Sequence, residues 1–192
     1  HLKGDIVTST AAAIETFDAT VEEMERRYDQ IVVKGGAINI DDYNRKVPAE
    51  GQLPRLYFFH DEMGDWMADA TSPEYQKAVE SRIVRLASKS RAAGIHLFLI
   101  TQRPDRDALP STIKANAGNR ICLKVASQIN SQIILDQGGS EDLLGRGHMA
   151  AKLPGDPTMH TGGLVYAQSP FADIDHLREL ATAVREHWAS RS

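Results

Sequence analysis

The chain has 192 residues, enough for one domain that buries a sizeable core. Its 42% hydrophobic and 25% charged residues are ordinary for a soluble globular protein, and a net charge of −4 excludes a surface that coats nucleic acid through bulk positive charge. A single cysteine, Cys122, excludes an internal disulfide and indicates a reducing, cytoplasmic setting. No apolar run reaches the ~20 residues of a membrane-spanning helix, so we expect no membrane contact by this segment.

The first predicted element is a long amphipathic helix from Thr10 to Tyr28. Its apolar residues recur at spacings of three and four, which places them on one face. They are Ile14, Phe17, Val21, Met24 and Tyr28. Gly35-Gly36 ends the helix, residues 38–47 are expected to form a loop or short helical turn, and residues 48–54 form a connection. A short apolar strand is predicted next, from Leu56 to His60.

A second helix is predicted after Thr71-Ser72-Pro73-Glu74, where Ser72 can cap the first turn and Pro73 suits the first helical position. This helix is expected to end at Gly94. An apolar strand from Ile95 to Thr101 follows. Because two strands joined by a helix of this length form a right-handed crossover, we predict that the two strands are parallel.

Two further strands are predicted at residues 119–125 and 164–167, and a helix at residues 172–188 closes the chain. This last helix has an apolar stripe that we expect to face the core. The stripe is formed by Ile174, Leu177, Leu180, Val184 and Trp188. Strands that alternate with helices predict an α/β fold, with a parallel sheet flanked by helices.

Polar residues follow the first two predicted strands at their carboxyl ends. Asp61 and Glu62 end one strand, and Thr101 and Gln102 end the next. In open parallel sheets, ligands bind at these ends, and adjacent carboxylates there can hold Mg²⁺ and activate water. Taken alone, an Asp-Glu pair is also what an ordinary solvated strand end contains, so its interpretation depends on the motifs that follow.

A series of short motifs runs in order along nearly the whole chain. The motifs are Met24-Glu25-Arg26-Arg27-Tyr28, Tyr43-Asn44, Lys89 to Leu97, Thr101-Gln102-Arg103-Pro104, Ile113-Lys114-Ala115-Asn116, Arg120-Ile121, Ile134 to Gly139 and Leu143 to Met149. This series resembles the motor domain of the FtsK/SpoIIIE family of DNA translocases, in the HerA/FtsK superfamily. The resemblance implies a RecA-like ATPase core of the P-loop NTPase type, which assembles as a hexameric ring around double-stranded DNA and moves along it using ATP.

The resemblance also implies roles for the polar residues at the strand ends. Asp61 resembles the Walker B aspartate that holds Mg²⁺, and Glu62 resembles the base that polarises the attacking water. Gln102 resembles the residue that senses the γ-phosphate of ATP. Arg91 matches the arginine that ring motors of this kind insert into the neighbouring subunit's site, with Arg85 and Arg120 as secondary candidates. The alternative for Arg91 is a surface residue paired with a carboxylate.

Three basic residues follow the second strand, in a region that can face the central channel of such a ring. Arg103, Arg106 and Lys114 would contact the phosphates of double-stranded DNA without reading its sequence. The alternative is ordinary surface charge, offset by Asp105 and Asp107.

The sequence departs from the family pattern in one major respect, since it contains no glycine-rich phosphate loop ending in Gly-Lys-Ser/Thr. Together with a start at His1 rather than Met, this predicts the C-terminal part of a motor domain. We expect residues 1–54 to form the N-terminal helix and connection, 55–170 the Walker B core and 171–192 the C-terminal helix. The isolated chain is predicted not to hydrolyse ATP. Smaller departures are His60 and His148, where the family usually has an aliphatic residue and often has Asp, respectively.

Three functions remain open at this point. The first is a DNA translocase motor for chromosome segregation, sporulation or conjugation, whose parent protein could be anchored at the inner face of the cell membrane. The second is a secretion-type ATPase of the same superfamily that grips polypeptide. The third is a non-catalytic interaction module, which the missing phosphate loop favours.

Overall fold

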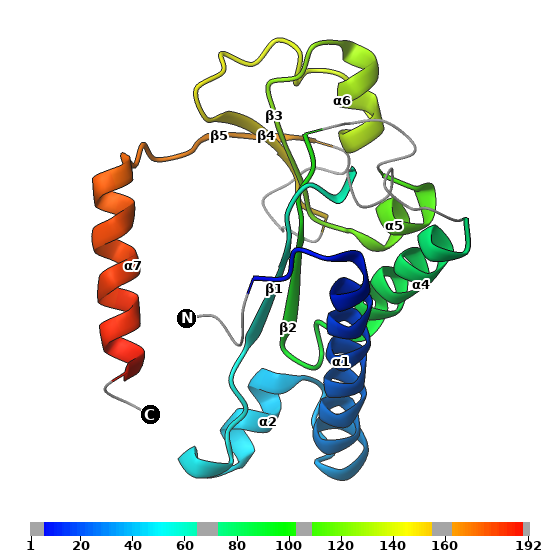
Figure 1. The fold of residues 1–192 in the computed structure, drawn as a ribbon, viewed down its shortest axis with the longest axis vertical. Coiled ribbons are helices and arrows are strands. Elements are labelled where there is room, and N and C mark those ends of the chain that lie inside the picture. The colour runs from blue at the N-terminus through cyan, green and yellow to red at the C-terminus, as the bar shows by residue number, and fades with distance from the viewer. Residues whose placement is uncertain (1–5, 65–72, 103–108, 155–162, 190–192) are drawn as a thin grey trace.

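The computed structural model describes residues 6–64, 73–102, 109–154 and 163–189 (Figure 1). The elements in chain order are α1 (Thr10–Tyr28), η1 (Asp29–Lys34), α2 (Ile40–Lys46), η2 (Ala49–Gly51), β1 (Leu56–His60), α4 (Pro73–Lys89), β2 (Ile95–Leu99), α5 (Ser111–Asn116), β3 (Arg120–Leu123), α6 (Gln128–Leu135), β4 (His148–Lys152), β5 (Val165–Gln168) and α7 (Ile174–Ala189). Within these residues, no helix combines the length and the apolarity needed to cross a bilayer.

Strands β1 and β2 form a parallel pair, as the crossover pattern predicts. Their register pairs Leu56 with Ile95 at one end and His60 with Leu99 at the other. Helix α4 connects them and ends at Lys89, five residues before the predicted end at Gly94. A tight turn lies between the end of α4 and β2. In this turn Gly94 has φ +71°, and its amide donates to the Arg91 carbonyl at 3.2 Å.

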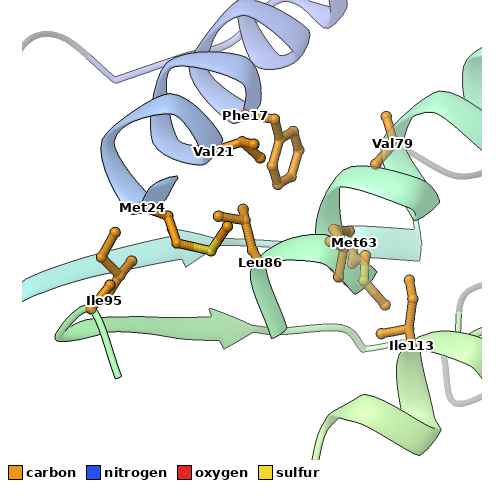
Figure 2. Close-up of a cluster of buried hydrophobic side chains, with 10 residues drawn as sticks. Phe17, Val21, Met24, Met63, Val79, Leu86, Ile95 and Ile113 are labelled. Carbon is orange, nitrogen blue, oxygen red and sulfur yellow. The ribbon is translucent and has the colours of Figure 1, made fainter. Parts of the chain in front are cut away.

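The main core lies between this pair of strands and helices α1 and α4. Phe17 and Met24 of α1, Leu86 of α4 and Ile95 of β2 are all at most 1% exposed and belong to one cluster, together with Ile113 of α5 (Figure 2). The spacing of apolar residues in α1 and α4 directs their stripes toward each other and toward the strands. The predicted helix from Thr10 to Tyr28 is therefore confirmed, in both its bounds and its buried face.

The opposite face of the β1–β2 pair is covered much less. Tyr57 and Phe59 of β1 are 59% and 64% exposed, and Phe98 of β2 is 44% exposed. Their rings form a row on the surface, in which Phe59 stacks on Phe98 at 4.6 Å between centroids. Parallel strands usually bury both faces, so this row is unusual for a complete α/β sheet.

The second sheet is antiparallel, with strand order β3-β4-β5. Strands β3 and β5 match the predictions at 119–125 and 164–167, whereas β4 was not predicted. Its sequence His-Met-Ala-Ala-Lys lacks the β-branched and aromatic residues that mark a strand, and it pairs because Ala150 and Ala151 are buried against its neighbours. The parallel sheet of the predicted α/β fold is thus accompanied by an antiparallel one.

Helix α7 corrects the prediction that its apolar stripe faces the core. The helix forms over Ile174–Ala189, but it stands apart from the other described helices and strands (Figure 1). Ile174, Leu177, Leu180 and Val184 are 60%, 49%, 50% and 43% exposed. The side chain of Trp188 lies outside the described residues. The periodicity correctly predicted which residues share a face of the helix, but that face does not pack on the core of this chain.

Candidate nucleotide-hydrolysis site

The candidate site is built where β1 and β2 end side by side. Two backbone hydrogen bonds extend the parallel pairing past the strands: the Ile100 amide donates to the His60 carbonyl at 2.9 Å, and the Met63 amide donates to the Ile100 carbonyl at 2.8 Å. The structure therefore brings Asp61 and Glu62 next to the end of β2, as the parallel topology predicts.

Glu62 is the best-defined member of the site. Its carboxylate accepts a hydrogen bond from the Thr101 hydroxyl at 2.9 Å and another from the Gln102 backbone amide at 3.0 Å. Its backbone has φ +48°, in the left-handed region that non-glycine residues rarely adopt. The side chain therefore bridges from the end of β1 to the end of β2. Sequence reasoning named Thr101 only as a polar residue at the strand end and missed its contact with Glu62.

Asp61 is exposed at the carboxyl end of β1. One of its carboxylate oxygens accepts a hydrogen bond from the Glu62 amide at 3.1 Å, which fixes the turn. In the described ranges, no group of three or more His, Cys, Asp or Glu side chains could hold a metal ion. The single exposed carboxylate of Asp61 nevertheless fits Mg²⁺. In nucleotide sites Mg²⁺ keeps several waters and takes only one or two protein carboxylates besides the phosphates.

His60 links the site to the core. It is 7% exposed, and its ring lies 5.6 Å from the ring of Phe17 in α1. Burial lowers the pKa of His60, although the charge of Asp61 acts in the opposite direction. His60 therefore packs against the core next to the two carboxylates, where burial disfavours its charged form.

Gln102 and Arg91 occupy opposite ends of β2. Gln102 is exposed at the carboxyl end, beside Glu62, whereas Arg91 is exposed in the turn that precedes the strand. The five residues of β2 lie between them, and these alone span roughly 15–20 Å. The structure therefore brings Gln102 to the carboxylates of its own chain but keeps Arg91 away from them.

The two secondary arginine candidates are engaged in contacts between elements of this chain. Arg85 of α4 donates to Glu25 of α1 at 3.1 Å. Arg120 at the start of β3 donates to the Ile134 carbonyl at 3.0 Å and to the Asp136 carboxylate at 2.7 Å. Both guanidinium groups thus hold neighbouring elements together.

Of the basic residues predicted to contact DNA, Arg103 and Arg106 lie outside the described residues. Lys114 of α5 is described, and its ammonium group lies 2.7 Å from Asp136 and 3.1 Å from the Ile133 carbonyl. Lys152 of β4 contacts the same carboxylate at 2.8 Å. The structure therefore places Lys114 in a cluster that sequence reasoning did not anticipate.

This cluster surrounds the C-terminal end of α6. Asp136 caps the helix with φ +63°, and three cations, Lys114, Arg120 and Lys152, surround its carboxylate. Hydrogen bonds from Arg120, Lys114 and Lys152, in that order, hold the pKa of Asp136 well below its usual range. The cations also bond the last carbonyls of the helix, where positive charge is favourable.

Comparison with solved structures defines the class of protein. The chain superimposes on TcpA, the conjugation coupling protein of pCW3 solved as a monomer with ATPγS, with a TM-score of 0.76 and 31% identity over 90% of this chain and 48% of that one. It matches the type VII secretion ATPase EccC of Thermomonospora curvata with a TM-score of 0.62 at 20% identity, over 88% of this chain and 20% of that one. The fold is that of a RecA-like ATPase of the P-loop type, with the carboxylates of the candidate site at the end of its parallel strands.

Sequence comparison then defines the family. The family model for FtsK/SpoIIIE matches residues 1–106. The DNA translocase FtsK of Helicobacter pylori is 35% identical over 96% of this chain and 20% of its own length, and that of Campylobacter jejuni is 37% identical over 97% and 19%. The chain belongs to the FtsK/SpoIIIE family, and it spans about a fifth of the length of these relatives.

Proposed function

We propose that this chain is the water-activating part of an ATP-driven motor that moves double-stranded DNA. The observation that carries the proposal is the position of Glu62, whose carboxylate is fixed between the ends of two parallel strands, next to the exposed Asp61. Family membership and the names of the FtsK relatives support DNA as the substrate.

Each residue of the site has a chemical task in this proposal. Asp61 holds Mg²⁺, which neutralises charge on the phosphates when it is bound. Glu62 accepts a hydrogen bond from the attacking water and so orients and polarises it. Gln102, at the neighbouring strand end, would contact the γ-phosphate when ATP is bound. The ATP itself requires a phosphate-binding loop, which is not among the 192 residues of this sequence.

Arg91 completes the site of a neighbouring subunit. Because it lies at the opposite end of β2 from Glu62, it is unable to serve the carboxylates of its own chain. A head-to-tail ring, proposed here to be a hexamer, brings the Arg91 of one subunit to the Glu62 of the next. A guanidinium in that position stabilises the charge on the transferred phosphoryl group, so hydrolysis depends on assembly of the ring.

DNA contact is assigned to Arg103, Arg106 and Lys114, which would hold the phosphate backbone electrostatically. A polypeptide-moving function has less support, since the type VII secretion ATPase EccC is only 20% identical to this chain and shares its fold alone. A non-catalytic role would leave the Glu62 contacts without a use. We propose chromosome segregation, sporulation or conjugation as the setting, with the motor at the inner face of the membrane.

The proposed division of the chain follows its packing. Residues 1–54 supply α1 and the connection, 55–170 the Walker B core and 171–192 the C-terminal helix. The exposed aromatic row of β1 and β2 and the exposed stripe of α7 support a place within a larger motor domain. We therefore expect the isolated chain to show no ATP turnover.

The test is the ATPase activity of the full-length protein with and without linear duplex DNA. We expect DNA to stimulate hydrolysis, and Glu62→Gln to lower kcat by ~10²–10⁴-fold because the amide is a poor base. Glu50→Gln, which changes an exposed carboxylate in η2, is the matched control and should leave kcat unchanged. Full activity of Glu62→Gln, or stimulation by unfolded polypeptide in place of DNA, would refute the proposal.

A further inference from the structure

We infer that Thr101 is a positioning residue for ATP hydrolysis, which holds the carboxylate of Glu62 in the orientation that activates water. The inference deepens the proposed function and depends on it. It assigns a task to a side chain that sits between the base and the γ-phosphate sensor and has no other role in the proposed mechanism.

The ends of the two strands bring Thr101 within reach of Glu62. The register ends where His60 pairs with Leu99, and the Ile100 amide then donates to the His60 carbonyl, so the segments that carry Glu62 and Thr101 leave the strands side by side. The Thr101 hydroxyl is half-buried at the strand end and donates to one oxygen of Glu62 at 2.9 Å. The contact therefore comes from the same parallel pairing that builds the site.

The second carboxylate oxygen of Glu62 is also fixed. It accepts the Gln102 amide at 3.0 Å, so both oxygens of the carboxylate are bonded to consecutive residues of one strand end. Two bonds from a rigid edge set the plane of the carboxylate as well as its position. Glu62 also has left-handed backbone geometry, which directs its side chain toward β2.

This arrangement orients the carboxylate without using up its capacity as a base. An ionised carboxylate has roughly four lone-pair sites, two on each oxygen. Thr101 and the Gln102 amide bond to different oxygens and take one site on each, so these two bonds do not by themselves fill both sites of either oxygen. Glu62 is thus a base that is held in orientation by a further residue, Thr101. The same arrangement of a base and an orienting group is found beside activated nucleophiles in enzymes.

The contact also connects the base to the sensor. The carboxylate of Glu62 binds the backbone of Gln102, whose side chain is proposed to contact the γ-phosphate. Thr101 and Gln102 therefore hold the base and the sensor residue at the same strand end.

The test is steady-state ATPase kinetics of the full-length protein with saturating duplex DNA. Thr101→Val keeps the shape of the side chain but removes the donor, and we expect kcat to fall about 10–100-fold with KM for ATP nearly unchanged, since a misplaced base affects the chemical step rather than binding. Thr101→Ser restores the hydroxyl and should recover most of kcat.

A matched control comes from a second threonine. The Thr112 hydroxyl of α5 donates to the Glu80 carboxylate of α4 at an exposed position outside the site. Thr112→Val removes the same type of hydrogen bond, and we expect it to leave kcat unchanged. An equal loss in Thr101→Val and Thr112→Val would reveal a general effect on stability and contradict the inference.

A double-mutant cycle with Glu62→Gln separates positioning from a structural role. If Thr101 acts through Glu62, Thr101→Val costs nothing further in the Glu62→Gln background. A loss of the same factor in both backgrounds, or an unchanged kcat in Thr101→Val, overturns the inference while leaving the proposed function intact. A wild-type protein without DNA-stimulated hydrolysis would overturn both.

Discussion

Glu23 and Arg27 form a nearly buried ion pair one turn apart on α1, with 2.7 Å between the guanidinium nitrogen and the carboxylate oxygen. Arg27 is only 3% exposed, and it also donates to the Pro54 carbonyl at 2.6 Å and to the Ala93 carbonyl at 3.4 Å. Pro54 and Ala93 each lie two residues before the first residue of a strand, Leu56 of β1 and Ile95 of β2. The pair therefore anchors the first helix to the entrances of both parallel strands.

Loss of this guanidinium should be costly. Arg27→Met leaves the Pro54 and Ala93 carbonyls without this donor and leaves Glu23 with Arg26 alone, so we expect the free energy of unfolding to fall by about 3 kcal/mol. Arg26→Met is the matched control on the same helix, since Arg26 also binds Glu23 but is 55% exposed, and it should cost less than about 1 kcal/mol. Urea denaturation followed by circular dichroism measures both, and equal losses would contradict the role given to Arg27.

The same carboxylate predicts how stability depends on pH. A hydrogen bond from Arg26, followed by one from Arg27 and opposed by burial, lowers the pKa of Glu23 to about 2 from its usual 4.5. The folded chain holds Glu23 ionised while the unfolded chain protonates it, so its stabilisation is complete above pH 4.5 and is lost as the pH falls toward 2. Glu23→Gln should flatten this part of the pH profile of unfolding, whereas Glu22→Gln, an exposed neighbour, should leave it unchanged.

The turn that holds Arg91 depends on Gly94. This glycine has φ +71°, and a Cβ added there would lie 2.3 Å from Cδ1 of Ile40. We expect Gly94→Ala to destabilise the fold by at least ~2 kcal/mol, from strain and overpacking together. Gly51→Ala serves as the control, because its nearest contact is 3.6 Å and its φ is not positive. Thermal unfolding of the two variants gives the comparison, and similar midpoints would contradict this interpretation.

The separation of Arg91 from Glu62 predicts complementation between subunits. Arg91→Ala and Glu62→Gln should each abolish most ATPase activity of the full-length protein. Mixed rings should recover activity, because some interfaces then combine an intact Arg91 with an intact Glu62 from different subunits. Rings made only of the doubly substituted chain provide the baseline. Mixtures that never exceed the single variants would show that Arg91 acts elsewhere.

The cluster around Asp136 predicts a trade between stability and DNA affinity. Asp136→Asn removes the carboxylate that neutralises Lys114, so we expect tighter duplex binding by the full-length protein and a salt dependence steeper by about one phosphate contact. Because this carboxylate is 41% exposed, the stability cost should stay near 1 kcal/mol. Asp142→Asn, an exposed change nearby, should alter neither quantity. Fluorescence anisotropy at several salt concentrations measures both the affinity for duplex DNA and its dependence on salt.

Several features of the candidate site follow from the sequence because they depend on local order. The apolar run from Leu56 to His60, the helix after Pro73 and the run from Ile95 are each specified by short-range patterns, and the handedness of the crossover then makes the strands parallel. This is sufficient to bring Asp61 and Gln102 to the same edge of a sheet. The family follows from the same ordered motifs.

By itself, the sequence determined the main helices, the parallel strand pair, the family and the residue types at the strand ends, because periodicity and motif order are properties of the chain. Only the tertiary structure decided that Glu62 binds Thr101, that Lys114 binds Asp136, that β4 pairs with β3 and β5, and that the stripe of α7 is exposed. The first three depend on contacts between residues far apart in the sequence, and the exposure of the α7 stripe depends on how the described part of the chain packs around it. Their energies are set by the packing of the whole chain rather than by local preference.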